Sequence, residues 1–132
     1  METIAHIRTE FSEKFGIPRQ SGLVPAAKGR IFFEKQYRNP DAIRGIEEFS
    51  HLWLIWGFSA NKEKKRSLLV NPPRLGGKEK RGVFATRSPF RPIGLGLSSV
   101  VIEKIEIDKK YGPVIWVSGV DMLDNTPIYY IK

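Results

Sequence analysis

Short apolar segments separated by turn-forming residues dominate this sequence and restrict it to a small fold built from β-strands. The run at residues 51–58 reads HLWLIWGF; it is almost continuously apolar, too short for a long helix and rich in strand-forming side chains. We therefore predict a central strand there, buried on both faces. Further strands are expected at residues 2–9, 29–35, 82–86, 98–107 and 113–121.

The spacing of these segments, with turn signals between them, favours a closed or nearly closed β-barrel over a doubly wound sheet. Within residues 98–107 the apolar alternation slips near Glu103 and Lys104, which predicts a β-bulge. The 132 residues contain no internal repeat and no domain boundary. We expect one domain over residues 1–132, dominated by β-structure: a small closed barrel with one short helix and long Pro/Gly-rich loops.

The short helix is expected just after Asn39. The Asn39 side chain can cap its first turn, and Pro40 suits the first helical position. Gly45 weakens the helix and should keep it short. Its apolar side consists of Ile43, Ile46 and Phe49.

Composition excludes several kinds of metal and redox site. The chain contains no cysteine, so disulfides and thiolate ligands are ruled out. Its two histidines, His6 and His51, lie far apart in the sequence, which is a poor pattern for a metal site, and we predict no metal. We interpret His51, at the start of the apolar run, as a partly buried imidazole with a hydrogen-bond partner.

The charge balance points towards a polyanionic partner. Lys and Arg number 22 against 14 for Asp and Glu, a formal charge of +8, and such an excess favours binding of nucleic acid. No segment approaches the ~18 apolar residues of a membrane-spanning helix. The N-terminal residues, METIAHIRTEF, lack the layout of a secretory signal. We expect a cytoplasmic protein that does not associate with membranes.

Common catalytic and nucleotide-binding motifs are missing. No phosphate-binding loop ends in Gly-Lys-Ser/Thr, and no G-x-G-x-x-G follows a strand; residues 93–97, IGLGL, supply only G-x-G. The serines lack the context of a hydrolase nucleophile. These observations disfavour nucleotide hydrolysis, Rossmann-type dinucleotide binding and serine hydrolysis.

Three polar segments remain as candidates for a binding site. They read GIPRQSGLV at 16–24, GVFATRSPFRPIGLGLSS at 82–99 and DMLDNTP at 121–127. Each also has a plain structural interpretation: a solvated loop for the first, and a turn capped by aspartates for the third. In the second, Arg87 and Arg91 can pair with structural carboxylates instead of a ligand.

Taken together, these segments resemble the TsaA-like family, whose best-known members are the TrmO-type tRNA methyltransferases. The matching stretches occur in the order and spacing of the family over essentially the whole chain. They are FGIPRQSGLV, DAIRGIEEFSHLWLIWGF, NPPRLGG, GVFATRSPFRP and DMLDNTPIYYIK.

The resemblance implies a fold and a chemistry. The family is a small β-barrel methyltransferase that uses S-adenosyl-L-methionine and works as a homodimer, with the cofactor near the subunit interface. Its characterised bacterial activity methylates N6 of threonylcarbamoyl-adenosine beside the tRNA anticodon. The alternatives are a methyltransferase with another acceptor and a non-catalytic module that binds S-adenosylmethionine or RNA.

Site residues follow from the resemblance, position by position. Arg19 suits a carboxylate or a substrate phosphate, and Asp124 an ammonium group or a ribose hydroxyl, whereas the backbone of Leu97 matches a position at the adenine. Arg91 is expected to support the loop or to contact the tRNA backbone. The full set of implied cofactor contacts is Pro18, Arg19, Gln20, Ser59, Ala60, Arg87, Leu97, Leu123, Asp124, Asn125 and Thr126.

Methyl transfer from a sulfonium is an in-line displacement, so holding donor and acceptor in register can supply most of the catalysis. We therefore expect positioning first and base catalysis second. The catalytic residue stays open: Asp121 and His51 are candidates for a proton acceptor, and the substrate's own carboxylate is a third.

The sequence departs from the family pattern in four places, of which the replacement of a common glycine by Asn125 is mild because both residues tolerate positive φ. Residues 93–96 read Ile-Gly-Leu-Gly where the family usually has Asn-Pro-Ile-Gly, and Ser59 and Ala60 replace a common His-Gln. Many bacterial members continue into a further C-terminal domain, whereas this sequence stops at Lys132. The basic loops 61–66 and 74–81 are then expected to supply more of the phosphate contacts.

Overall fold

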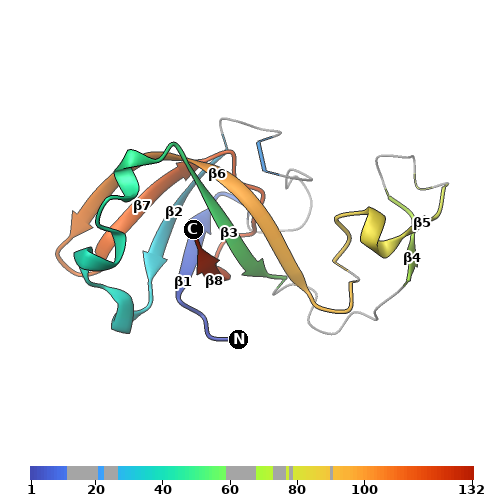
Figure 1. Cartoon of the computed structure of the whole chain (residues 1–132), viewed down its shortest axis with the longest axis horizontal. Helices are drawn as coiled ribbons and strands as arrows, with labels where there is room; N and C mark the ends of the chain where they lie inside the picture. The colour runs from blue at the N-terminus through green and yellow to red at the C-terminus, as the bar shows by residue number, and fades with distance from the viewer. Residues whose placement is uncertain (12–20, 23–26, 59–67, 73–76, 78, 90) are drawn as a thin grey trace.

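The computed structural model describes residues 1–11, 21–22, 27–58, 68–72, 77, 79–89 and 91–132. Six strands close into an antiparallel barrel in the order β1-β2-β7-β6-β3-β8, which confirms the predicted barrel (Figure 1). A two-stranded pair, β4 (Leu69–Val70) and β5 (Arg81–Gly82), lies beside it. The barrel strands are β1 (Ala5–Thr9), β2 (Lys28–Phe33), β3 (His51–Gly57), β6 (Leu95–Asp108), β7 (Gly112–Ser118) and β8 (Thr126–Ile131).

Side chains alternate between the inside and the outside of the barrel along each strand. The prediction that residues 51–58 are buried on both faces is wrong. Leu52 and Leu54 are buried, but Trp53 between them is 52% exposed. In a barrel the outer face of a strand is covered only where another element packs on it, and Trp53 on β3 stays exposed. The apolar outer face of β3 is consequently left open to solvent.

Strand β6 is long enough to join two neighbours in succession. Its first half pairs with β3 from Leu95 to Val101, and its second half pairs with β7 from Val101 to Asp108. The register shifts between Ile102 and Lys104, which confirms the bulge predicted at this point. Strand β6 therefore runs from the part of the barrel surface beside β3 to the part beside β7.

The predicted helix forms as two successive 3-10 helices, η2 (Pro40–Ile43) and η3 (Ile46–Glu48). Asn39 caps the first as expected, its Oδ1 accepting from the Asp41 N–H at 3.0 Å. Gly45 adopts φ +89°, a left-handed conformation that ends η2 and prevents one continuous helix. Of the predicted apolar stripe, Ile43 is buried, whereas Phe49 is 66% exposed.

Two other segments differ from the sequence analysis. Residues 82–86 do not form a strand: β5 ends at Gly82 and a 3-10 helix, η6 (Val83–Ala85), follows. Strand β8 was not predicted, and it closes the barrel between β1 and β3. A further 3-10 helix, η1 (Lys35–Tyr37), follows β2. No helix among the described residues is long and apolar enough to cross a membrane.

Candidate functional site

Arg87 lies in the loop after η6 and reaches the edge of the barrel where β6 begins. Its Nη2 donates to the backbone carbonyl of Leu97 at 2.7 Å and lies 3.7 Å from Oδ2 of Asp121. The Arg87 side chain is still 48% exposed. A guanidinium has five N–H donors. Two contacts therefore fix its position while leaving donors available to a ligand.

Asp121 is the buried anchor of this arrangement, with its side chain only 3% exposed. Its Oδ1 accepts from the Ser98 hydroxyl at 2.6 Å, and its carboxylate also accepts from the backbone N–H of Ser21. Burial raises the pKa of Asp121, and the Ser98 hydrogen bond and the charge of Arg87 offset that effect only in part. Asp121 thus holds three distant segments of the chain in place.

Behind Asp121 the hydrogen bonds continue into the barrel core. The indole Nε1 of Trp56 donates to the Ser98 hydroxyl at 2.9 Å, which in turn donates to Asp121. Gly96 lies against the same indole, because a Cβ there would come within 2.3 Å of the ring. Sequence reasoning missed Trp56 and Ser98. The available signal was a serine at an inward position of an alternating strand.

The predicted cofactor residues Pro18, Arg19 and Gln20 lie outside the described residues, but the residue after them is well placed. The Ser21 hydroxyl accepts from the Ser99 N–H on β6 at 3.0 Å. Gly22 N–H donates to the Gly119 carbonyl at 2.9 Å. Ser21 therefore meets β6 beside Asp121.

Ser59 and Ala60 likewise lie outside the described residues. The Phe58 N–H before them donates to the Gly94 carbonyl at 3.1 Å. The predicted phosphate-binding loops are also affected: residues 61–66, 74–76 and 78 lie outside the described residues. Segment 93–96, which differs from the family pattern, is thus hydrogen-bonded to the residue that follows β3.

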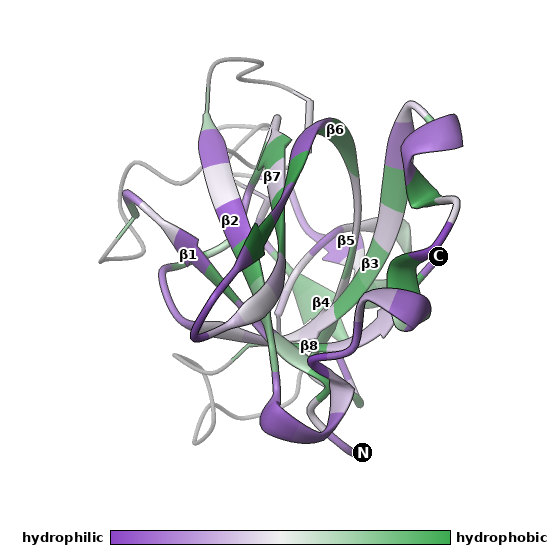
Figure 2. Cartoon of the chain, turned by 90° about the vertical axis from the view of Figure 1, so that its left-hand side faces the viewer, coloured by the Kyte–Doolittle hydropathy of each residue, from purple (hydrophilic) through white to green (hydrophobic). Residues whose placement is uncertain are grey.

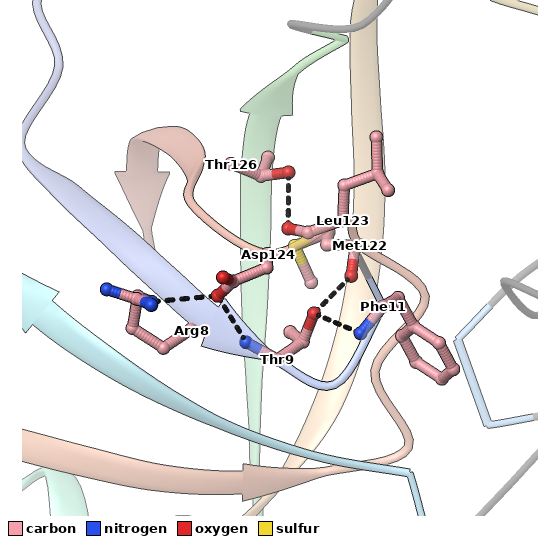
Figure 3. Close-up of polar contacts among 7 residues, drawn as sticks. All are labelled: Arg8, Thr9, Phe11, Met122, Leu123, Asp124 and Thr126. Carbon is pink, nitrogen blue, oxygen red and sulfur yellow. Dashed lines mark hydrogen bonds and ion pairs between the residues drawn. The ribbon is translucent and has the colours of Figure 1, made fainter. Parts of the chain in front are cut away.

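The turn that contains Asp124 is tied to β1 (Figure 3). Asp124 Oδ1 accepts from Arg8 Nε at 2.8 Å and from the Thr9 N–H at 3.0 Å. Burial alone would raise the pKa of Asp124, but the hydrogen bonds from Arg8 and Thr9 outweigh it and hold the pKa below its usual value. The Thr9 hydroxyl donates to the Met122 carbonyl at 2.9 Å. These contacts give Asp124 a structural role in this turn.

The remaining predicted residues of the turn also make local contacts. The Thr126 hydroxyl donates to the Leu123 carbonyl at 2.7 Å, and Thr126 is buried. Asn125 has φ +65°, which confirms the predicted tolerance for a left-handed turn. The structure therefore makes 121–126 a rigid turn that starts at Asp121.

Arg91 and His51 are both separate from the Asp121 cluster. Arg91 donates to the Thr86 carbonyl at 2.6 Å, so it supports the loop, as one of its two predicted roles required. His51 is exposed, not partly buried as predicted, and its Nδ1 lies 2.7 Å from the Ser50 hydroxyl. It pairs with Val101 on β6, four positions beyond Leu97. Among the described residues, no group of three potential ligands could hold a metal ion.

The structure defines a small closed antiparallel barrel with a half-exposed arginine, Arg87, held at its rim by the buried Asp121. The family model for the tRNA-methyltransferase O N-terminal domain matches residues 6–132. The chain therefore belongs to this family, which confirms the resemblance drawn from the sequence.

Individual relatives agree with this assignment. A Pseudomonas aeruginosa protein, whose name includes the words S-adenosylmethionine-dependent methyltransferase, is 48% identical over 98% of this chain and 52% of its own length. The tRNA (adenine(37)-N6)-methyltransferase of Escherichia coli is 42% identical over 99% of this chain and 55% of its own. A crystal structure of TrmO from Pseudomonas aeruginosa has a TM-score of 0.76 and 40% identity over 99% of this chain and 53% of its own. The chain spans about half the length of these relatives.

Proposed function

We propose that the protein is an S-adenosylmethionine-dependent methyltransferase that acts on tRNA, at N6 of threonylcarbamoyl-adenosine beside the anticodon. Support comes from the family and from the activity named for the Escherichia coli relative. The observation that carries the proposal is the convergence of Ser21, Arg87 and Asp121 at the start of β6. Three segments far apart in the sequence thereby form one site.

The chemistry of the site fits the proposed cofactor. S-adenosylmethionine supplies a methyl group that its sulfonium already activates for displacement. Arg87 presents guanidinium N–H groups that suit its carboxylate, because such charge-assisted hydrogen bonds are short and strong. The Leu97 backbone beside Arg87 would face the adenine, and Leu123, Asn125 and Thr126 would line the pocket from the rigid turn. The remaining residues proposed to complete the pocket are Pro18, Arg19, Gln20, Ser59 and Ala60.

We assign Asp121 to positioning rather than to proton transfer. Both of its oxygens are engaged, Oδ1 by Ser98 and Oδ2 by Arg87, and its side chain is buried. His51 lies at the other end of β3 from this cluster. Fixing donor and acceptor in line is therefore the main contribution of the chain, and a carboxylate on the substrate would accept the proton.

Titration calorimetry with S-adenosylmethionine and with its demethylated product tests the site. Arg87→Ala should weaken both affinities about tenfold or more, because it removes one charge-assisted hydrogen-bonding group from the site. Arg44→Ala is the matched control, because Arg44 is an exposed arginine paired with the nearby Asp41. Unchanged binding by Arg87→Ala would remove the proposed site.

Mass spectrometry of tRNA nucleosides tests the reaction. The substrate is tRNA that carries threonylcarbamoyl-adenosine but lacks its N6-methyl group. Incubating it with the protein and S-adenosylmethionine should add one methyl group to threonylcarbamoyl-adenosine. If the protein binds the cofactor but does not form this product, a methyltransferase with another acceptor would be favoured. If no acceptor is methylated at all, a non-catalytic binding module would be favoured.

We further propose that residues 1–132 act as one domain, in a homodimer, in the cytoplasm where tRNA is used. The outer faces of β3, β6 and β8 support dimerisation, because they leave large hydrophobic side chains exposed. These exposed side chains are Trp53, Leu97, Val101 and Tyr130. Trp53→Ser combined with Tyr130→Ser should shift the protein from dimer to monomer in light scattering after gel filtration.

A further inference from the structure

A second group of side chains lies at the far end of β6 from Arg87, on the outer surface where β2, β7 and β6 pair. Arg30 and Lys104 flank Trp116 across the sheet, because each of them is its register partner. The Arg30 guanidinium carbon is 5.1 Å from the Trp116 ring centroid, and Lys104 Nζ is 4.5 Å from it. Figure 2 shows that β2 changes along its length from hydrophilic residues at its start to hydrophobic residues at its end.

The same pattern continues towards the β6–β7 turn. Arg38 and Lys110 lie 5.4 Å and 5.2 Å from the Tyr111 ring centroid. Phe32 packs edge-on against Tyr111 at 5.3 Å and also contacts Arg30. We call this group the basic face; its members are Arg30, Phe32, Arg38, Lys104, Lys110, Tyr111 and Trp116.

Among the described residues, no ion pair involves a cation of the basic face. Within the described part of the chain, Arg30, Lys104 and Lys110 have no carboxylate at ion-pair distance, in contrast to Arg8 with Asp124. Three acidic residues lie close to these cations in the sequence. Asp108 accepts from the backbone N–H groups of Lys110 and Tyr111, and the charge of Lys110 helps to lower the pKa of Asp108. Glu103 accepts from Ser118, and Glu106 lies one outward position beyond Lys104.

Trp116 also carries a hydrogen-bond donor without a partner among the described residues. This donor, its Nε1–H, is buried. Positive groups held together on aromatic rings repel one another, and phosphate groups between them would remove that cost. Interleaved cations and aromatic rings are the surface that nucleic-acid backbones and unstacked bases bind. The charge and the rings together favour RNA.

The distance between the two sites limits what can contact both. Leu97 and Lys104 both lie on β6, seven positions apart from 97 to 104. An extended strand of that length spans about 23 Å, since each residue rises about 3.3 Å. A cofactor or a free nucleoside at Arg87 is too short to reach Lys104, whereas a folded RNA is long enough.

We propose that the basic face binds the phosphate backbone of the RNA substrate while the target nucleoside occupies the site at Arg87. The inference rests on the proposed function, which makes RNA the substrate. Beyond that function, the inference assigns the basic face a role in selecting RNA over a small-molecule acceptor.

The test compares two charge-matched double variants. Arg30→Gln with Lys104→Gln removes two cations of the basic face, and Lys35→Gln with Arg44→Gln removes two exposed cations elsewhere. Binding of unmodified tRNA is measured by fluorescence anisotropy over a range of salt concentrations. The first variant should bind roughly tenfold more weakly, and its salt-dependence slope should fall by about 1.4 to 1.8, as expected when two cations no longer neutralise phosphates. The second should stay close to the wild type.

A third variant tests the role of the ring. Trp116→Leu keeps every charge but removes the platform, so it should weaken tRNA binding a few-fold with the salt slope unchanged. In methylation assays, loss of the two cations should raise KM for tRNA about tenfold and leave kcat unchanged.

The outcomes separate this inference from the proposed function. Binding and slope equal to those of the Lys35/Arg44 control would overturn the basic face, even if the enzyme methylates tRNA. Failure of the wild type to bind S-adenosylmethionine or to methylate tRNA would instead overturn the proposed function. In that case, selective loss of RNA binding by the first variant would still support the surface.

Discussion

Arg87 and Asp121 form an ion pair with one partner in solvent and the other inside the protein. Their closest atoms are 3.7 Å apart, and the side chains are 48% and 3% exposed. A buried carboxylate is costly unless it is compensated, and here Ser98 and the Ser21 backbone provide part of the compensation. Such an arrangement sacrifices some stability to fix an exposed cation, as binding sites commonly do.

Asp121→Asn should therefore separate function from stability. The folded-state pKa of Asp121 is raised, so its contribution to stability is fully present below its ordinary pKa and is lost as the pH rises through the folded value. At pH 7 the uncharged amide avoids this loss. The variant should unfold at the same temperature as the wild type or a higher one, while its affinity for S-adenosylmethionine falls about tenfold.

Calorimetric melting from pH 4 to pH 8 checks the first half of this prediction, and titration with the cofactor checks the second. Asp41→Asn is the control, because Asp41 is an exposed carboxylate paired with Arg44. An Asp121→Asn protein that melts well below the wild type at pH 7 would contradict the assigned pKa direction.

Ser98→Ala should destabilise the protein by about 1–3 kcal/mol. The change leaves the Trp56 Nε1–H without its acceptor and removes a donor from the buried Asp121 carboxylate. Urea unfolding followed by tryptophan fluorescence measures the loss. Ser99→Ala, on the outer side of the same strand, should change the free energy of unfolding by less than about 0.5 kcal/mol. Equal effects of the two changes would show that the buried chain of hydrogen bonds contributes little.

The barrel itself was predictable because alternation and turn spacing are local signals. The bulge near Glu103, the cap at Asn39 and the left-handed Asn125 all follow from short-range rules and agree with the structure. Burial of 51–58 was mispredicted for a different reason. An apolar run does not reveal whether its second face meets another layer of the fold or solvent.

The site was only partly predictable. The resemblance pointed to Arg87 and to the 121–127 turn, but not to the partners that position them. Ser98 and Trp56 act through contacts 23 and 42 positions away in the chain, and no sequence pattern links such residues. Asp124 was predicted to bind a ligand group through its carboxylate, and this stays a prediction; the sequence did not indicate that its Oδ1 accepts from Arg8 and Thr9. Pairing across the barrel decides these roles.

Asp124→Asn should destabilise the protein at neutral pH by about 1 kcal/mol, because the pair with Arg8 loses its charge. The folded-state pKa of Asp124 is lowered, so its contribution is present above the ordinary pKa and is lost as the pH falls through the folded value. The difference in melting temperature between wild type and variant should thus shrink as the pH falls below 3.8, the ordinary pKa of an aspartate. A difference that stays constant over that range would show that charge plays no part.

Gly96→Ala should be the most disruptive of these small changes. A Cβ at Gly96 would lie 2.3 Å from ring atoms of Trp56, an indole that Ser98 holds by its hydrogen bond, so the ring has little freedom to move. Overpacking of this kind costs about 1–3 kcal/mol or more. Gly94→Ala is the matched control two residues away, because a Cβ there meets nothing within 4 Å. Thermal melts should show a fall of several degrees for Gly96→Ala and almost none for Gly94→Ala. Equal melting temperatures would mean that Trp56 can shift, and the G-x-G pair of residues 94–96 would then need an explanation other than packing.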